Sequence, residues 1–172
     1  MEEHYLNKNA KTVLVGRRVN LSAKISKILN PAKIEKGYLE GYSIFINLLW
    51  HKLSGSGSHV ENAIFIKSRF LRRFLNKKRR GILGSNFSVH KSDLISINGF
   101  DERYLAPAWG EDTDIDYRFG LIGIKNQSLK HIAIQYHTYH KTLDRVSGNA
   151  EIYQKTVDEK IWYTPFGINQ IK

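Results

Sequence analysis

The stretch Trp109-Gly110-Glu111-Asp112-Thr113-Asp114-Ile115-Asp116 has the densest group of acids in the chain, and the sequence continues to Gly123 as Tyr-Arg-Phe-Gly-Leu-Ile-Gly. Ile115, Phe119 and Ile122 recur at helical spacing, which predicts an amphipathic helix over residues 112–122 that is closed by Gly123. Acids in the first turn are favourable because the start of a helix has a partial positive charge. The stretch therefore predicts a helix whose first turn presents carboxylates.

Asp112 is the candidate catalytic residue of this helix. A carboxylate at a helix start, beside a glycine that lets a ligand approach the backbone, can act as a general base, and Trp109 can stack on a sugar ring or a base. Helix capping by Asp112, Thr113 and Asp114 is an alternative explanation of the acids. A calcium loop is excluded, because Tyr117 stands where that loop needs glycine and Gly123 where it needs glutamate.

The segments on either side alternate between strand-like and helix-like patterns. Runs rich in β-branched and apolar residues predict strands over residues 11–21, 82–89 and 129–136. Helical spacing is found over 22–53, with a break at Pro31, and over 149–162. This alternation predicts an α/β fold with a mixed sheet flanked by helices, in one domain over 1–172 with a core of about 11–141 and a helical tail of about 149–163.

Charge and composition limit the ligands that the chain can bind and the kinds of site that it can contain. The 172 residues have 27 Lys+Arg and 16 Asp+Glu, and eight of the cations lie between Lys67 and Arg80 in a segment without acids. Such a segment can bind nucleic acid, an anionic membrane or a phosphate-bearing substrate, or can simply be a solvated helix face. No apolar run approaches the roughly 20 residues of a membrane span, and the absence of cysteine excludes disulfides and thiolate zinc sites. We expect a cytoplasmic protein.

His137 and His140 are a second group of candidate functional residues, at the end of the strand predicted over 129–136. Two histidines three residues apart can share one metal ion. They can equally be ordinary, partly buried polar residues, and the spacing alone leaves both explanations open.

Three segments follow one another in a specific order: GSNFSVHKSDLISINGFDE from Gly84, APAWGEDTDIDYRFGLIG from Ala106 and IQYHTYH from Ile134. With this order and its Gly-Phe-Asp-Glu and Trp-Gly-x-Asp pairing, the region from about Lys11 to Lys141 resembles the C-terminal half of inverting GT-A glycosyltransferases of family 2. The resemblance is to the segment shared with the galactosyltransferase C-terminal domain. It implies the acceptor-side half of a GT-A, Rossmann-like fold.

The resemblance implies roles on the acceptor side of the site. Asp112 matches the general base that deprotonates the acceptor hydroxyl while this oxygen attacks the anomeric carbon with inversion. Trp109 and Gly110 match the acceptor-side wall, and Glu111 is expected to hydrogen-bond the acceptor. Asn86 is expected on a strand that faces the sugar.

The resemblance also implies residues for the donor and a metal. His137 matches the histidine that completes a divalent metal site holding Mn²⁺ or Mg²⁺, and His140 is the alternative ligand. Arg17 or Arg18, on the first strand, is expected to meet the donor phosphates.

The expected function is therefore transfer of a hexose or N-acetylhexosamine from a nucleotide-diphosphate sugar to a glycan acceptor, which can be lipid-linked, in bacterial surface polysaccharide or lipopolysaccharide synthesis. The nucleotide-binding half with its Asp-x-Asp motif, on the order of 100 residues, is expected to be missing from the N-terminus. The alternative is a non-catalytic acceptor- or membrane-binding module left by that truncation. Residues 67–80 are expected to contact the inner face of a membrane. Another chain is expected to cover the exposed sheet edge. Nucleic acid is not expected to bind.

Overall fold

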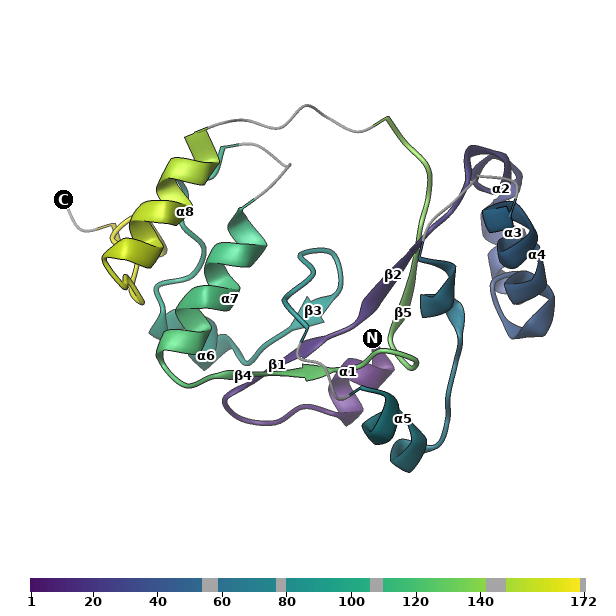
Figure 1. The fold of residues 1–172 in the computed structure, drawn as a ribbon, viewed down its shortest axis with the longest axis horizontal. Coiled ribbons are helices and arrows are strands. Elements are labelled where there is room, and N and C mark those ends of the chain that lie inside the picture. The colour runs from purple at the N-terminus through teal and green to yellow at the C-terminus, as the bar shows by residue number, and fades with distance from the viewer. Residues whose placement is uncertain (54–58, 77–79, 106–109, 142–147, 171–172) are drawn as a thin grey trace. The chain divides into compact units, whose positions relative to one another are not determined.

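The computed structural model describes residues 1–53, 59–76, 80–105, 110–141 and 148–170 (Figure 1). The chain divides into two compact units. Unit 1 comprises Met1–Val15, Lys78–Leu129 and Thr142–Lys172, and unit 2 comprises Gly16–Lys77 and Lys130–Lys141. Each unit has its own sheet and its own apolar core.

Unit 1 is built on a three-stranded mixed sheet with the order β3-β1-β4. The central strand β1 (Thr12–Val15) is antiparallel to β3 (Phe87–Ser88), with Leu14 opposite Ser88. The same strand is parallel to β4 (Lys125–Ser128). This mixed sheet and the helices beside it confirm the predicted α/β class.

Helix α7 (Glu111–Leu121) packs against this sheet because its apolar residues recur on one face. Ile115 and Phe119, four residues apart, are fully buried against Val13 and Val15 of β1. Figure 1 shows α8 (Gly148–Asp158) beside α7. The remaining helices of unit 1 are α1 (Glu2–Leu6) and α6 (Lys91–Ser96).

Unit 2 contains a two-stranded parallel sheet of β2 (Arg17–Asn20) and β5 (Ile134–His137). Its core is formed by Val19 and Leu21 together with apolar residues from the helices that follow β2. The helices after β2 are, in chain order, α2 (Ala23–Ile28), α3 (Pro31–Glu35), α4 (Gly41–Leu53), the 3-10 helix η1 (Val60–Ala63) and α5 (Arg69–Leu75), and the core residues come from α2, α4 and η1. Among the residues that the structure describes, no helix is both long and apolar enough to cross a membrane.

The predicted strands are shorter than their sequence patterns. Residues 11–21 form two strands, β1 and β2, that belong to different sheets and are separated by Gly16. Of residues 82–89 only Phe87–Ser88 is a strand, and residues 129–133, which include the buried Leu129, Ile132 and Ala133, lie between β4 and β5. An apolar, β-branched pattern indicates burial, whereas the hydrogen-bond partners that define a strand depend on the rest of the chain. The break at Pro31 is confirmed, because Pro31 is the first residue of α3.

Candidate functional site

The start of α7 is fixed by Gly110. This residue has φ +119°, and its carbonyl accepts the Asp114 amide at 2.7 Å. A Cβ at position 110 would lie 2.6 Å from Cε1 of Tyr104, so glycine is required by both its conformation and its packing. Gly110 therefore sets the point at which the acidic stretch becomes helical. Trp109, the predicted acceptor wall, lies outside the described residues.

Asp112 lies in the first turn of α7, half-buried, against the loop that precedes β3. Its Oδ2 accepts the Gly84 amide at 3.1 Å, and a Cβ on Gly84 would lie 3.5 Å from the same oxygen. Its Oδ1 accepts the Thr113 hydroxyl at 3.4 Å. Two neutral donors hold the side chain, which leaves the carboxylate with unused acceptor positions for a ligand hydroxyl.

Glu111 has a carboxylate oxygen, Oε2, that is buried and has no hydrogen-bond partner within the described part of the chain. Buried carboxylate oxygens are normally hydrogen-bonded, because removal from water is costly. Glu111 and Asp112 are thus adjacent acceptors at one helix end.

The other acids of the stretch have structural partners. Asp114 is buried in an ion pair with Arg118, whose Nε donates to Oδ2 at 2.7 Å. Burial raises the pKa of the Asp114 carboxyl and the Arg118 guanidinium opposes that effect. Asp116 accepts the Asn126 side-chain amide at 2.6 Å.

The carboxylates of Asp112, Asp114 and Asp116 therefore point to different partners. In a calcium loop these carboxylates would converge on one ion, whereas here they lie in a helix and contact different groups. Capping is not their role, because the N-cap of α7 is Gly110 and no side chain caps it. The capping alternative is wrong for Asp114, which is an interior ion-pair partner.

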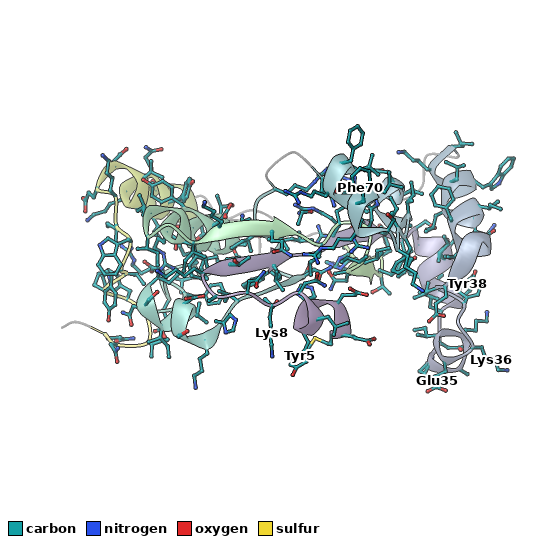
Figure 2. All side chains as sticks on the ribbon, turned by 90° about the horizontal axis from the view of Figure 1, so that it is seen from below. Tyr5, Lys8, Glu35, Lys36, Tyr38 and Phe70 are labelled. Carbon is teal, nitrogen blue, oxygen red and sulfur yellow. The ribbon has the colours of Figure 1, made fainter. Side chains whose placement is uncertain are left out.

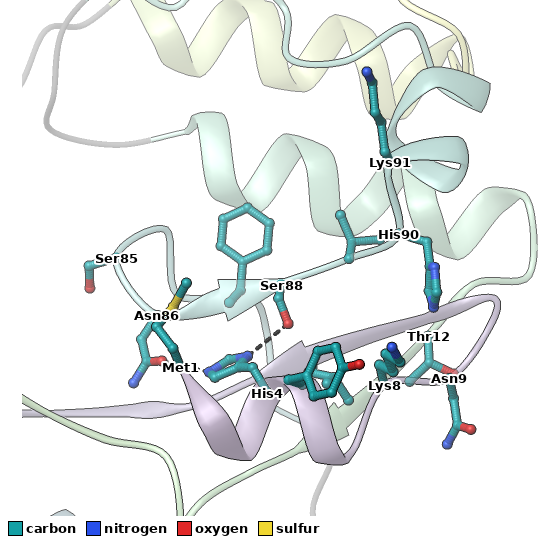
Figure 3. Close-up of a pocket in the computed structure, with 14 residues that line it drawn as sticks. Met1, His4, Lys8, Asn9, Thr12, Ser85, Asn86, Ser88, His90 and Lys91 are labelled. Atoms are coloured by element: carbon teal, nitrogen blue, oxygen red, sulfur yellow. Dashed lines mark hydrogen bonds between the residues drawn. The ribbon is translucent and has the colours of Figure 1, made fainter.

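A cavity of about 570 Å³ lies in unit 1 between α1 and the segment around β3 (Figure 3). The His4 ring joins its two walls, because Nε2 donates to Asn86 Oδ1 at 3.0 Å and Nδ1 then accepts the Ser88 hydroxyl at 2.8 Å. Cationic or protonatable side chains from both walls line it, namely His4, Lys8, His90 and Lys91. Figure 2 shows Tyr5 of α1 close to Lys8, which follows that helix, and the Lys8 ammonium lies 3.8 Å from the Tyr5 ring centroid.

The loop from Leu83 to Asn86 connects this cavity with the start of α7. Its turn is closed by the Asn86 amide, which donates to the Leu83 carbonyl at 2.8 Å. Gly84 in this loop binds Asp112, while Ser85 and Asn86 line the cavity. Asn86 was predicted on a strand, and it lies in the turn just before β3.

The remaining candidates belong to unit 2. Nε2 of His137 at the end of β5 lies 3.0 Å from Nε2 of His140. His140 Nδ1 lies 3.0 Å from the Lys141 carbonyl, to which only a protonated Nδ1 can donate. Partial burial, the Arg18 charge and His140 lower the pKa of His137.

The two arginine candidates differ in position on β2. In the parallel register Arg18 is opposite Gln135 and Asn20 is opposite His137. Because side chains alternate between the faces of a strand, Arg18 and His137 share one face, while Arg17 is on the face of the core residue Val19. Arg18 is thus the arginine that the sheet places beside the histidine pair.

Two imidazole nitrogens 3.0 Å apart fit neighbouring ligands of one divalent ion, for which each metal–nitrogen distance is about 2.0–2.2 Å. Within the described residues, no group of three or more His, Cys, Asp or Glu side chains surrounds a metal position. A metal ion held by this pair would need its further ligands from water or substrate.

Several contributors to this site have no motif in the sequence. His4 lies more than eighty residues from Ser88 and Asn86, so its position depends on tertiary packing. Gly84 was part of the motif quoted above, but its hydrogen bond to Asp112 depends on how the loop meets α7. Only the glycine itself, which allows close backbone approach, is a local signal.

Residues 71–141 match a family model described as the N-terminal domain of galactosyltransferase. The matched region includes β3, α6, α7, β4 and β5, and therefore Asp112 and both histidines. No curated protein and no solved structure matches the chain. The region from 71 to 141, less than half of the chain, is thus similar to a galactosyltransferase-like glycosyltransferase domain.

Proposed function

We propose that this chain is the acceptor-side part of an inverting glycosyltransferase of family 2 type with a GT-A fold, in which Asp112 is the general base. The observation behind the proposal is the position of Asp112, at the start of a helix within the glycosyltransferase-like region and held by the Gly84 amide. A base needs a fixed position within hydrogen-bond reach of the proton that it removes.

In the proposed reaction the acceptor hydroxyl binds at the start of α7. Asp112 accepts its proton as the oxygen attacks the anomeric carbon, and the nucleoside diphosphate leaves from the opposite face. Glu111, beside Asp112 at the start of α7, is proposed to hydrogen-bond the acceptor. Trp109 and Gly110 complete the acceptor wall.

In unit 2, Arg18 and the histidine pair are proposed to bind the donor phosphates. A divalent ion such as Mn²⁺ or Mg²⁺, when bound, neutralises charge on the leaving diphosphate. His137 and His140 would hold it through Nε2, and Arg18 on the same strand face would add a positive charge for the phosphates. The cavity at Asn86, lined by Lys8 and Lys91, favours an anionic ligand as well.

The proposed substrates are a nucleotide-diphosphate hexose or N-acetylhexosamine and a glycan acceptor. Growing bacterial surface polysaccharide or lipopolysaccharide, carried on a lipid at the cytoplasmic side of a membrane, is the proposed setting. A nucleotide-binding half, in the same or another chain, would supply the rest of the donor site.

The test is calorimetric titration of the full chain with a panel of uridine diphosphate sugars, with and without Mn²⁺, followed by measurement of uridine diphosphate release with oligosaccharide acceptors. We expect Mn²⁺-dependent binding of one donor that disappears in His137→Ala, and acceptor-dependent release when the nucleotide-binding half is supplied. Binding of glycan acceptors by the folded chain without donor binding would instead assign it to the non-catalytic acceptor module.

A further inference from the structure

Helix α4 of unit 2 is apolar on two faces. Ile44 and Leu48 on one face are buried with Val19, Leu21 and Val60 in the core of the unit. On the opposite side, residues at positions 46, 49, 50 and 53 recur at helical spacing and are exposed. Their exposed fractions are 64% for Ile46, 43% for Leu49, 72% for Trp50 and 76% for Leu53.

The buried face already explains how α4 packs. A second stripe of large apolar side chains exposed to water opposes solubility and marks an interaction surface. We call the residues Ile46, Leu49, Trp50 and Leu53 the α4 stripe.

Helix α5 adds a second apolar and cationic surface in the same unit. Phe70 and Phe74 are 83% and 60% exposed, and Figure 2 shows Phe70 pointing away from the ribbon. Contacts with the segment before β5 hold this helix in place. The Asn76 side-chain amide donates to the Lys130 carbonyl at 3.3 Å, and the Ile66 amide donates to the His131 carbonyl at 2.9 Å.

The cations around these apolar side chains are available for a partner. Lys67, Arg69 and Arg73 are exposed and have no ion-pair partner within the described part of the chain. Arg72 instead donates to the carbonyls of Ile66 and Lys67, both at 2.7 Å, which fixes the start of α5.

The local charge balance is strongly positive. Between residues 41 and 80 there are nine Lys and Arg residues and one acid, Glu61. Glu61 lies 3.5 Å from Lys52 Nζ, so it neutralises a residue of α4 and none of the α5 cations. An exposed apolar stripe with a tryptophan, in a unit that also exposes the cations of α5, has the chemistry of a surface that lies in the interface of an anionic bilayer.

We propose that unit 2 docks on an anionic phospholipid membrane through the α4 stripe and α5. The apolar side chains enter the boundary between headgroups and acyl chains, where Trp50 is favoured, and Lys67, Arg69 and Arg73 contact lipid phosphates. Nucleic acid fits less well, because it offers no apolar medium for Ile46 and Leu53. This docking is independent of glycosyl transfer and is measured without donor or acceptor.

The experiment is co-sedimentation of the full chain with vesicles of phosphatidylcholine, alone or mixed with phosphatidylglycerol. We expect binding to the mixed vesicles that weakens as salt is raised, and little binding to phosphatidylcholine alone. In a Trp109→Phe/Trp162→Phe variant Trp50 is the sole tryptophan, and its fluorescence should shift to the blue and be quenched by brominated acyl chains.

Matched variants separate the contribution of the apolar α4 stripe to membrane binding from the contribution of the α5 cations. Trp50→Ser should weaken binding roughly tenfold, whereas Leu105→Ser, which changes an exposed apolar residue of unit 1, should not. Arg69→Glu/Arg73→Glu should weaken it on the order of 30-fold, since each lost cation costs about fivefold, and Lys125→Glu/Lys160→Glu in unit 1 should have little effect.

Equal effects of the stripe variants and the unit 1 controls would overturn the proposal. So would equal affinity for neutral and anionic vesicles. A concentration-dependent dimer in sedimentation velocity that Trp50→Ser dissociates, together with no vesicle binding, would assign the α4 stripe to a second copy of this chain.

Discussion

Gly110 and Gly123 border α7 and both have positive φ angles, of 119° and 78°. Their surroundings differ, because a Cβ at position 110 would meet the Tyr104 ring and one at position 123 would meet nothing within 4 Å. We predict that Gly110→Ala lowers the free energy of unfolding by about 2–4 kcal/mol, through strain and overpacking. Gly123→Ala should cost only about 1–2 kcal/mol. Urea unfolding measures both, and equal costs would show that the Tyr104 contact is not limiting.

Arg118 is the largest fully buried side chain of unit 1. Besides Asp114 it donates to the carbonyls of Ile97, at 2.8 Å, and Gly99, at 2.9 Å. Its guanidinium thus joins α7 to the end of α6. Each of its three nitrogens donates one of these hydrogen bonds, so its loss removes a donor from both carbonyls and from the buried Oδ2 of Asp114.

We predict that Arg118→Leu destabilises the protein by about 3–5 kcal/mol, because the buried Asp114 charge becomes uncompensated. The double variant Arg118→Leu/Asp114→Leu should recover part of this loss. Thermal or urea unfolding gives the free energy of unfolding of the two variants. A double variant that is less stable than Arg118→Leu would contradict the explanation.

At the scale of elements, the C-terminal segment docks on the loop after α6. The Asn98 side chain donates to the carbonyls of Thr164, at 2.6 Å, and Asn169, at 2.9 Å. Asp101 accepts the Thr164 hydroxyl at 2.7 Å and pairs with Arg103 at 2.8 Å. Burial raises the pKa of Asp101, but the hydrogen bonds from Arg103 and Thr164 outweigh it and the net pKa is lowered.

A carboxyl whose pKa is lower in the folded than in the unfolded state stabilises the fold above its unfolded pKa, near 3.8 for aspartate. That contribution is lost as pH falls through the lower folded value. We predict that Asp101→Asn costs about 1–3 kcal/mol at neutral pH, and that the difference from the wild type shrinks below pH 3.8. Urea unfolding at a series of pH values checks this, and a difference that stays constant in acid would contradict it.

The end of β5 supports a metal prediction at the same scale. His137→Ala and His140→Ala should each weaken Mn²⁺ binding by roughly 10-fold or more, because each removes one of two ligands. His59→Ala is the matched control, since His59 is exposed and pairs only with Glu61 in the described structure. Electron paramagnetic resonance of free Mn²⁺ measures the affinities. Unchanged affinity in both variants would remove the pair from metal binding.

Helices were more predictable than strands for a physical reason. The spacing of Ile115 and Phe119 and the ring of Pro31 act locally, so α7 and the start of α3 agree with the sequence within a residue. Strands need partners from elsewhere in the chain. Nothing within residues 11–21 indicates that the part before Gly16 pairs with β3 and β4 while the part after it pairs with β5.

At the scale of the whole molecule, the predicted site residues divide between the two units. Asp112, Glu111 and Asn86 belong to unit 1, whereas Arg17, Arg18 and both histidines belong to unit 2. The sequence indicated Asp112 through its motif, yet the Gly84 amide that holds it and the ion pair of Asp114 depend on long-range packing. The motif thus indicates a candidate residue, but not the long-range contacts that hold its side chain in place.

The central claim, that Asp112 is the general base, is tested most directly by comparing Asp112→Asn with Asp116→Asn. Both variants remove one charge from α7, one turn apart, and the amide oxygen introduced at position 116 can still accept the hydrogen bond from Asn126. In the enzyme completed by its nucleotide-binding half, we expect kcat of Asp112→Asn to fall by roughly 10²–10⁴-fold with donor affinity unchanged, and kcat of Asp116→Asn to stay close to the wild type. A kcat for Asp112→Asn equal to that of Asp116→Asn would contradict the assignment.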